Sequence, residues 1–343
     1  MDNKKTKSFV LLSGGLDSML AVRVLQEQGV EVVGLAFESN FYDAERAKKA
    51  AANLGIELRI VDIREQMLDL VKSPPHGHGK NLNPCIDCHA TMIRMASELA
   101  ESENIEIIAT GEVLGQRPMS QNYQSLEKVK RISGVEVLRP LSARLLPITK
   151  IEETKLIDRE RLLDIQGRGR LRQTELAKKY RINDYPSPAG GCLLTEKIFC
   201  ERLSEMLRYW PDCHQGDVEI LKNGRVFWFE FGAEKILAVV SRDQKEGSEL
   251  LRLAKQSDFI FDLDDIPGPT ALVRGKLNLS KKEITDIINK DQILTNLLIP
   301  DDLKNIRFED FPMIHDLFLE IAKLTAYFSV KARGGNVSLK IGV

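Results

Sequence analysis

The chain has 343 residues, with 49 Lys and Arg against 50 Asp and Glu, and a net charge of −1. This length exceeds what one hydrophobic core usually holds, so we expect two domains. The hydrophobic share of 43% excludes an intrinsically disordered chain, and no apolar run approaches the roughly 20 residues that span a bilayer. The start of the chain offers no apolar stretch long enough for a secretory signal, so we expect a cytoplasmic protein without a membrane partner.

Strands alternate with helices along the first half of the sequence. Apolar runs predict strands at residues 8–12, 30–37, 56–61 and 105–110, with a candidate fifth strand at 135–138. Helices are expected at residues 16–28, 43–54, 65–71, 89–100 and 151–163. This alternation predicts an α/β fold with a doubly wound parallel sheet over residues 1–180.

The pattern changes after residue 180. Residues 184–192 contain two prolines and two glycines, which predicts a loop, and we expect residues 181–214 to be a linker that carries Cys192. Beyond it, the pattern predicts a β-hairpin formed by residues 225–231 and 236–240, and then a helix at 249–255. Two further short strands are expected at 259–263 and 271–273. We therefore expect a second, smaller α+β domain over residues 215–343.

A phosphate-binding loop is predicted where the first strand ends, at Ser13-Gly14-Gly15-Leu16-Asp17-Ser18. Glycines let the backbone approach a ligand closely, and Ser13, Ser18 and the N–H groups of the helix start can donate to phosphate. A carboxylate at Asp17 suits a Mg²⁺ ion that bridges the phosphates. The motif is neither a Walker loop nor a dinucleotide fingerprint. An ordinary Gly-Gly turn capped by Asp17 is the alternative that these residues leave open.

The motif Ser-Gly-Gly-x-Asp-Ser after a first strand resembles the PP-loop of the ATP pyrophosphatases. Enzymes of that family adenylate an oxygen of their acceptor and release pyrophosphate. Residues 110–121 resemble the second loop of the tRNA 4-thiouridine synthetases, with one extra residue between the Gly-Gln and Ser-Gln pairs, and residues 138–141 and 147–152 continue the likeness. The resemblance implies an ATP site that also includes Thr110, Gly111 and Gln116, although a polar surface loop explains Gln116 as well.

Three cysteines are candidates for a reactive or metal-binding site. Cys85 and Cys88 form a Cys-x-x-Cys pair at the start of a helix, which favours thiolates. Such a pair can hold zinc, perform dithiol chemistry or be incidental, and structural zinc normally needs a second pair, which is absent. Cys192 is the candidate third ligand, because Ala189-Gly190-Gly191 lets the backbone turn its thiol inward. Three thiols with an open fourth position suit a [4Fe–4S] cluster.

The order of PP-loop, Cys-x-x-Cys and lone cysteine resembles the cluster-dependent tRNA thiolases. Asn83-Pro84-Cys85 also resembles the 2-thiouridylases, whose two cysteines act by persulfide chemistry, so that alternative stays open beside the preferred cluster. Of the remaining candidates, Cys200 is expected to be a buried structural thiol and Cys213 a surface residue. We expect His76 and His78 to lie in a solvated loop.

A basic segment overlaps the end of the helix predicted at residues 151–163 and continues beyond it. Eight basic and four acidic side chains occupy residues 158–181, and Arg168, Arg170 and Arg172 among them are candidate contacts to tRNA phosphates. A solvated helix face explains such a run too. Parts of residues 238–275 resemble the RNA-binding module of NFACT proteins, with a structural interface domain as the alternative.

The sequence thus predicts an ATP-dependent tRNA sulfurtransferase that makes 4-thiouridine or 2-thiouridine. ATP, Mg²⁺ and a [4Fe–4S] cluster are the expected cofactors, and Asp17, Cys85, Cys88 and Cys192 the expected catalytic residues. A cysteine desulfurase or inorganic sulfide would supply the sulfur, and a homodimer is left open. The alternatives are a PP-loop enzyme that transfers sulfur or nitrogen to a small molecule, and a non-catalytic RNA-binding iron–sulfur protein.

Overall fold

The computed structural model describes residues 6–187, 191–277, 293–300 and 302–342. The chain divides into two compact units, residues 1–200 and 201–343, each with a hydrophobic core of its own. Within the described ranges, no helix combines the length and the apolar character needed to cross a membrane.

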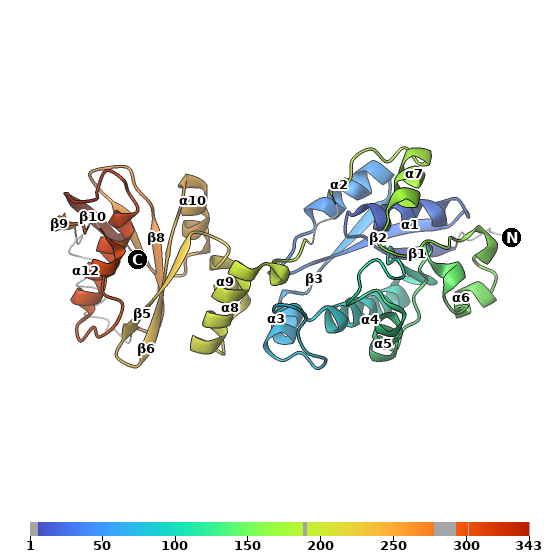
Figure 1. The fold of residues 1–343 in the computed structure, drawn as a ribbon, viewed down its shortest axis with the longest axis horizontal. Coiled ribbons are helices and arrows are strands. Elements are labelled where there is room, and N and C mark those ends of the chain that lie inside the picture. The colour runs from blue at the N-terminus through green and yellow to red at the C-terminus, as the bar shows by residue number, and fades with distance from the viewer. Residues whose placement is uncertain (1–5, 188–190, 278–292, 301, 343) are drawn as a thin grey trace. The chain divides into compact units, whose positions relative to one another are not determined.

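A four-stranded parallel sheet of order β3-β2-β1-β4 forms the centre of the first unit (Figure 1). Its strands are β1 (Lys7–Leu11), β2 (Glu31–Glu38), β3 (Glu57–Asp62) and β4 (Ile107–Thr110). Phe9 and Val10 of the central strand are fully buried, as an interior parallel strand requires. Because β1 and β4 are parallel neighbours, the loops at their carboxyl ends meet at one edge of the sheet.

Helices cover both faces of this sheet, which confirms the doubly wound α/β prediction (Figure 1). One face carries α1 (Leu16–Gln26), α2 (Glu45–Leu54) and α7 (Leu171–Lys179), and the other carries α3 (Arg64–Lys72), α4 (Cys85–Glu103) and α5 (Tyr123–Ser133). Short elements complete the unit: η1 (Ala143–Leu145), α6 (Lys150–Glu153), η2 (Arg159–Arg161) and η3 (Leu193–Thr195).

Two local predictions differ from the structure. Residues 135–138 form no full strand, since Leu138 makes only a single bridge to Ala109 of β4. The predicted helix over residues 151–163 is wrong, because α6 ends after one turn and Lys155 takes a φ of 60°. The chain folds back there, and the guanidinium of Arg159 pairs with Glu152.

The second unit is built on a six-stranded antiparallel sheet of order β5-β6-β8-β7-β10-β9, which confirms the predicted α+β class. Buried side chains of α12 pack on the sheet to form its core. The elements are α8 (Lys197–Tyr209), which begins in the first unit, α9 (Gln215–Ile220), β5 (Arg225–Phe231), β6 (Glu234–Val240), α10 (Gln244–Leu253), β7 (Phe259–Leu263), β8 (Ala271–Arg274), β9 (Ile293–Leu298), η4 (Leu303–Asn305), α12 (Ile314–Tyr327) and β10 (Asn336–Gly342).

Candidate nucleotide and thiol site

The phosphate loop joins β1 to α1. Gly14 has a φ of +75°, and a Cβ there would collide with the backbone of Arg46 on α2, so the position requires glycine. Gly15 is the N-cap of α1, and its N–H donates to Ser13 Oγ at 3.4 Å. The Ser18 hydroxyl donates to the Gly15 carbonyl at 2.8 Å. Within the described chain no side chain caps the first N–H groups of α1, so the start of this helix suits an anion.

Asp17 lies in a polar cluster at this loop. Its Oδ2 accepts hydrogen bonds from Gln116 Nε2 at 2.6 Å and from Arg170 Nη2 at 3.0 Å. Gln116 is held in turn by Gln173, whose Nε2 donates to Gln116 Oε1 at 3.1 Å. The other carboxylate oxygen, Asp17 Oδ1, is buried and has no hydrogen-bond partner among the described residues. An orphaned carboxylate oxygen beside a phosphate loop fits a hard cation such as Mg²⁺.

The second loop lies directly against the phosphate loop. A Cβ on Gly111 would lie 2.5 Å from the backbone nitrogen of Ser18, so the two loops are in close backbone contact. Thr110 ends β4, and its hydroxyl donates to Glu112 Oε2 at 3.1 Å. The structure therefore brings Thr110, Gly111 and Gln116 together with the first loop, at the place where the sequence puts an ATP site.

A buried charged network, which the sequence did not predict, links this loop to α4. Glu112 Oε2 accepts from Arg139 Nε at 2.9 Å, and Glu112 Oε1 lies 3.0 Å from His89 Nδ1. Arg139 and Glu112 are each about 8% exposed. Burial would raise the pKa of Glu112, but the Arg139 charge and the His89 hydrogen bond outweigh it and lower that pKa to about 2. Glu112 is therefore a buried carboxylate anion that holds β4 against the thiol-bearing helix.

Cys85 and Cys88 occupy the first turn of α4. Asn83 Nδ2 donates to Cys85 Sγ at 3.1 Å, and the Tyr42 hydroxyl lies 3.8 Å from Cys88 Sγ. Burial raises the pKa of Cys88 to about 12, a rise that the Tyr42 hydroxyl opposes and the charges of Cys192 and Cys85 increase. Without a ligand, Cys88 is thus a protonated thiol, in contrast to the thiolate expected at a helix start.

Cys192 lies close to this pair. The next residue, Leu193, donates its N–H to the Phe41 carbonyl at 2.9 Å, and Asn81 Nδ2 donates to the Thr195 carbonyl at 2.8 Å. Burial raises the pKa of Cys192 to about 11, and the charge of the first thiol of the pair adds to the rise. Two hydrogen bonds and electrostatic coupling therefore place all three predicted cysteines in one region.

Arg46 connects the thiol region to the phosphate loop. Its backbone lies against Gly14, and its Nη1 lies 3.5 Å from where a Cβ on Gly191 would be. Gly191 directly precedes Cys192. The predicted turn also includes Ala189 and Gly190, which are outside the described residues.

Within the described ranges, no three His, Cys, Asp or Glu side chains are grouped closely enough to hold a metal ion. The three thiols share one region, since Cys192 and Cys85 both contribute to the raised pKa of Cys88, but in this structure they do not form a ligand set.

The other two cysteines are both buried. Cys200 is 6% exposed and its Sγ lies 3.2 Å from the Leu194 carbonyl oxygen, in agreement with a buried structural thiol. The prediction that Cys213 is a surface residue is wrong, since only 4% of it is exposed. Its place directly after a Pro-Asp turn suggested exposure, but its N–H donates to the Trp210 carbonyl and turns the residue inward.

The two loop histidines are exposed, in agreement with a solvated loop, and each also contacts the rest of the protein. His76 Nδ1 lies 2.6 Å from Oδ1 of the buried Asp87, and His78 Nε2 lies 3.0 Å from the Val71 carbonyl oxygen. These contacts fix the loop that leads into the Cys-x-x-Cys pair.

The three arginines of the basic segment have different surroundings. Arg170 contacts Asp17 of the phosphate loop, whereas Arg172 pairs with Asp164 at 2.6 Å and is 51% exposed. Arg168 is exposed. The sequence groups these side chains, but the fold separates Arg170 from the other two.

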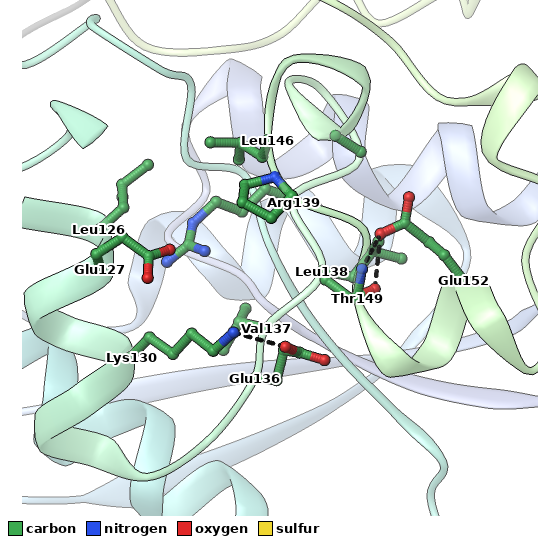
Figure 2. Close-up of a pocket in the computed structure, with 12 residues that line it drawn as sticks. Leu126, Glu127, Lys130, Glu136, Val137, Leu138, Arg139, Leu146, Thr149 and Glu152 are labelled. Atoms are coloured by element: carbon green, nitrogen blue, oxygen red, sulfur yellow. Dashed lines mark hydrogen bonds and ion pairs between the residues drawn. The ribbon is translucent and has the colours of Figure 1, made fainter. Parts of the chain in front are cut away.

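A separate pocket lies between α5 and residues 136–152 (Figure 2). Lys130 Nζ pairs with Glu136 Oε1 at 2.6 Å, and the Thr149 hydroxyl donates to Glu152 Oε2 at 2.7 Å (Figure 2). Arg139 also lines the pocket but is committed to the buried network. Two pairs of polar groups in this pocket thus satisfy each other, and no residue of the phosphate loop or thiol region lines it.

The comparisons with known proteins agree with the first unit's motifs. The family model described as "Thiamine biosynthesis protein (ThiI)" matches residues 4–145. Among solved structures, a predicted subunit of a tRNA methyltransferase from Methanocaldococcus jannaschii is 19% identical with a TM-score of 0.31, and the match covers 39% of this chain and 69% of that chain. A 4-thiouridine synthetase in complex with RNA and bound ATP is 20% identical with a TM-score of 0.36, and the match covers 63% of this chain and 52% of that chain. Over residues 4–145 the chain therefore resembles the ThiI family, which confirms the predicted likeness to PP-loop tRNA thiolases.

Proposed function

We propose that the protein is an ATP-dependent tRNA sulfurtransferase, which adenylates a uridine carbonyl oxygen and replaces that oxygen with sulfur. The observation that carries this proposal is the convergence of a phosphate loop and three thiols in one unit. Gly111 and Glu112 connect the phosphate loop to the thiol-bearing helix, and Arg46 connects it to the segment of Cys192. The family match over residues 4–145 supports the same assignment, and a soluble, cytoplasmic enzyme fits it.

The first half of the reaction uses the phosphate loop. The uridine carbonyl oxygen attacks the α-phosphorus of ATP, pyrophosphate leaves, and the base becomes an O-adenylate. Hydrogen-bond donors of Ser13, Ser18 and the start of α1 stabilise the charge that develops on the phosphates. Mg²⁺ bound at Asp17 would supply further charge neutralisation to the leaving pyrophosphate.

The second half needs a sulfur nucleophile at the activated carbon. Hydrosulfide attacks that carbon, and AMP leaves with the original oxygen. On the persulfide route the terminal sulfur of a cysteine persulfide attacks instead and AMP leaves; a second cysteine thiol then attacks the cysteine sulfur of the resulting disulfide, which releases the thiouridine and forms a protein disulfide that an external thiol reductant reduces. A [4Fe–4S] cluster held by Cys85, Cys88 and Cys192 would supply an iron without a protein ligand to bind the sulfur. The pKa values of Cys88 and Cys192 are raised, so these two thiols lose their protons only when a metal cluster binds them or at alkaline pH. The sulfur would come from a cysteine desulfurase or inorganic sulfide.

RNA would reach this site over a basic surface. Arg168, just before α7, and Arg172, in its first turn, are exposed, and we assign them to tRNA phosphates. The 4-thiouridine synthetase among the solved structures is bound to RNA and ATP, which is compatible with this assignment.

A second candidate function is sulfur transfer to a small molecule. The description of the matching family names thiamine biosynthesis, and thiamine contains a sulfur atom. Dependence of turnover on tRNA separates the two candidates.

The test measures pyrophosphate release and nucleoside composition with the full-length, anaerobically purified protein. We expect ATP turnover that requires tRNA and yields a thiouridine by mass spectrometry. Asp17→Ala should abolish both, because loss of one charge-positioning carboxylate costs on the order of 3 kcal/mol in the barrier. Asp43→Ala, at an exposed aspartate before α2, is the matched control and should turn over normally. Pyrophosphate release at the same rate with and without tRNA would favour the small-molecule candidate.

A further inference from the structure

Arg170 lies at the phosphate loop, although it belongs to a segment whose composition predicts RNA binding. Its Nη2 donates to Asp17 Oδ2 at 3.0 Å, and its side chain is 27% exposed. This is a half-sheltered guanidinium at the same carboxylate that we assign to Mg²⁺. An arginine that only contacts tRNA phosphates would be expected to be solvated and not to be hydrogen-bonded to this carboxylate.

The fold fixes Arg170 at this point from both sides. Before it, the Gly167 N–H donates to the Leu114 carbonyl at 2.7 Å, which joins its segment to the second loop. After it, α7 packs along α1, and at the far end of both helices the Tyr180 hydroxyl donates to Glu27 Oε2 at 2.7 Å. Arg170 therefore stands beside the start of α1 as a consequence of how α7 docks.

The charge balance of the cluster changes when the site is loaded. Asp17 Oδ2 already accepts from both Gln116 and Arg170, and only Oδ1 is without a partner. A cation at Asp17 repels the guanidinium at close range, so Arg170 then needs another anion within reach. Phosphate oxygens are the anions that the loop is built to hold, and the planar guanidinium binds them through paired hydrogen bonds.

We propose that Arg170 is a phosphate-binding residue of the nucleotide site and contacts the pyrophosphate portion of ATP. This assignment rests on the proposed function, since it presumes that the loop binds ATP. A Mg²⁺ ion held at Asp17 would compete with Arg170 for that carboxylate, so Arg170 would turn to the phosphates as the nucleotide binds. There it would stabilise the negative charge of the departing pyrophosphate.

Calorimetric titration of the full chain tests the proposal with three probes: Mg–ATP, Mg–pyrophosphate and AMP. Arg170→Ala should weaken ATP and pyrophosphate binding by about tenfold or more and leave AMP affinity unchanged. Arg170→Lys should bind pyrophosphate with intermediate affinity, because it keeps the charge and loses the planar fork. Lys178→Ala removes an exposed cation from α7, the helix that Arg170 caps, and should bind all three probes as the wild type does. The affinity for tRNA should be the same in Arg170→Ala as in the wild type.

The possible outcomes separate the two proposals. If the wild type binds ATP but Arg170→Ala and Arg170→Lys keep full pyrophosphate affinity, the assignment of Arg170 is overturned and the proposed function stands. If Arg170→Ala loses tRNA affinity and keeps pyrophosphate affinity, Arg170 is an RNA contact, and its assignment to the nucleotide site is overturned as well. A wild type that binds neither ATP nor pyrophosphate contradicts the proposed function as well. Circular dichroism of each variant checks that the change is not a loss of fold.

Discussion

Replacing Glu112 by glutamine should destabilise the first unit by about 3 kcal/mol at neutral pH. The substitution keeps the shape of the side chain but removes its charge, and Arg139, only 8% exposed, is left as a buried cation without a counter-charge. The magnitude follows from the pKa of Glu112, since a fall from 4.5 to about 2 on folding corresponds to about 3 kcal/mol. Proteins have marginal stability of about 5–15 kcal/mol, so the variant should still fold.

Urea unfolding of the full chain measures this loss. Both tryptophans, Trp210 and Trp228, lie in the second unit, so their fluorescence reports that unit, while far-ultraviolet circular dichroism reports both. We expect the circular dichroism transition of the first unit to move to a midpoint about 1.5 M lower in urea, for an m-value of about 2 kcal/mol/M. The matched control Glu127→Gln, at an exposed carboxylate on α5, should shift stability by less than about 0.5 kcal/mol.

The pH dependence of this difference has a definite sign. The pKa of Glu112 is lower in the folded than in the unfolded protein, so its stabilisation is fully present above about pH 4.5 and is lost as the pH falls to about 2. The gap between wild type and Glu112→Gln should therefore close as the solution is acidified through this range. A variant as stable as the wild type at pH 7, or a gap that widens in acid, would refute the account of the buried ion pair.

Two further predictions concern the thiols and the basic surface. Cys192→Ala should lose the iron of the anaerobic protein, which metal analysis should give as about four atoms per chain. Cys200→Ala should keep this iron, because Cys200 contacts backbone carbonyls in the interior. Equal iron in both variants would remove Cys192 from the site, and stoichiometric zinc would exclude the cluster. Replacing Arg168 and Arg172 together by alanine should weaken tRNA binding and reduce the slope of log affinity against log salt by about two, as two lost phosphate contacts require; an unchanged salt titration would make them ordinary surface side chains.

Sequence reasoning found the parts of the candidate site that are formed by consecutive residues. The phosphate loop is one turn between a strand and a helix, so its motif fixes its geometry locally, and Gly14 takes the left-handed φ that such a turn needs. The second loop was found through its resemblance to the 4-thiouridine synthetases, and the strand order of the structure, with β4 beside β1, explains why it lies next to the first loop. Local motifs thus predicted these two loops and the sheet topology places them side by side, while their role in binding a nucleotide stays a prediction.

The residues that were missed depend on tertiary contacts. Glu112, His89 and Arg139 come from a loop, a helix and an irregular segment, and none carries a motif of its own that would predict a buried ion pair. The available signals were weak: Glu112 directly follows Thr110-Gly111, and Arg139 lies in the Arg-Pro-Leu stretch. The helix predicted at residues 151–163 failed for the same reason, because the side-chain contacts of Arg159 favour a folded-back chain over helical propensity.

The proposed function asks one unit to join two chemistries, and the same tertiary contacts would connect them. In that proposal, adenylation would use donors and a metal at the start of α1, and sulfur transfer would use thiols at the start of α4, on the opposite face of the sheet (Figure 1). Glu112 lies where these requirements meet, since its backbone follows the glycine that contacts Ser18 and its carboxylate holds the histidine next to Cys88. A buried anion held by two basic side chains is rigid, because every movement would cost a charged hydrogen bond. In the proposed reaction, rigidity at this junction would fix the spacing between the activated carbon and the sulfur donor, which a two-step exchange of oxygen for sulfur requires.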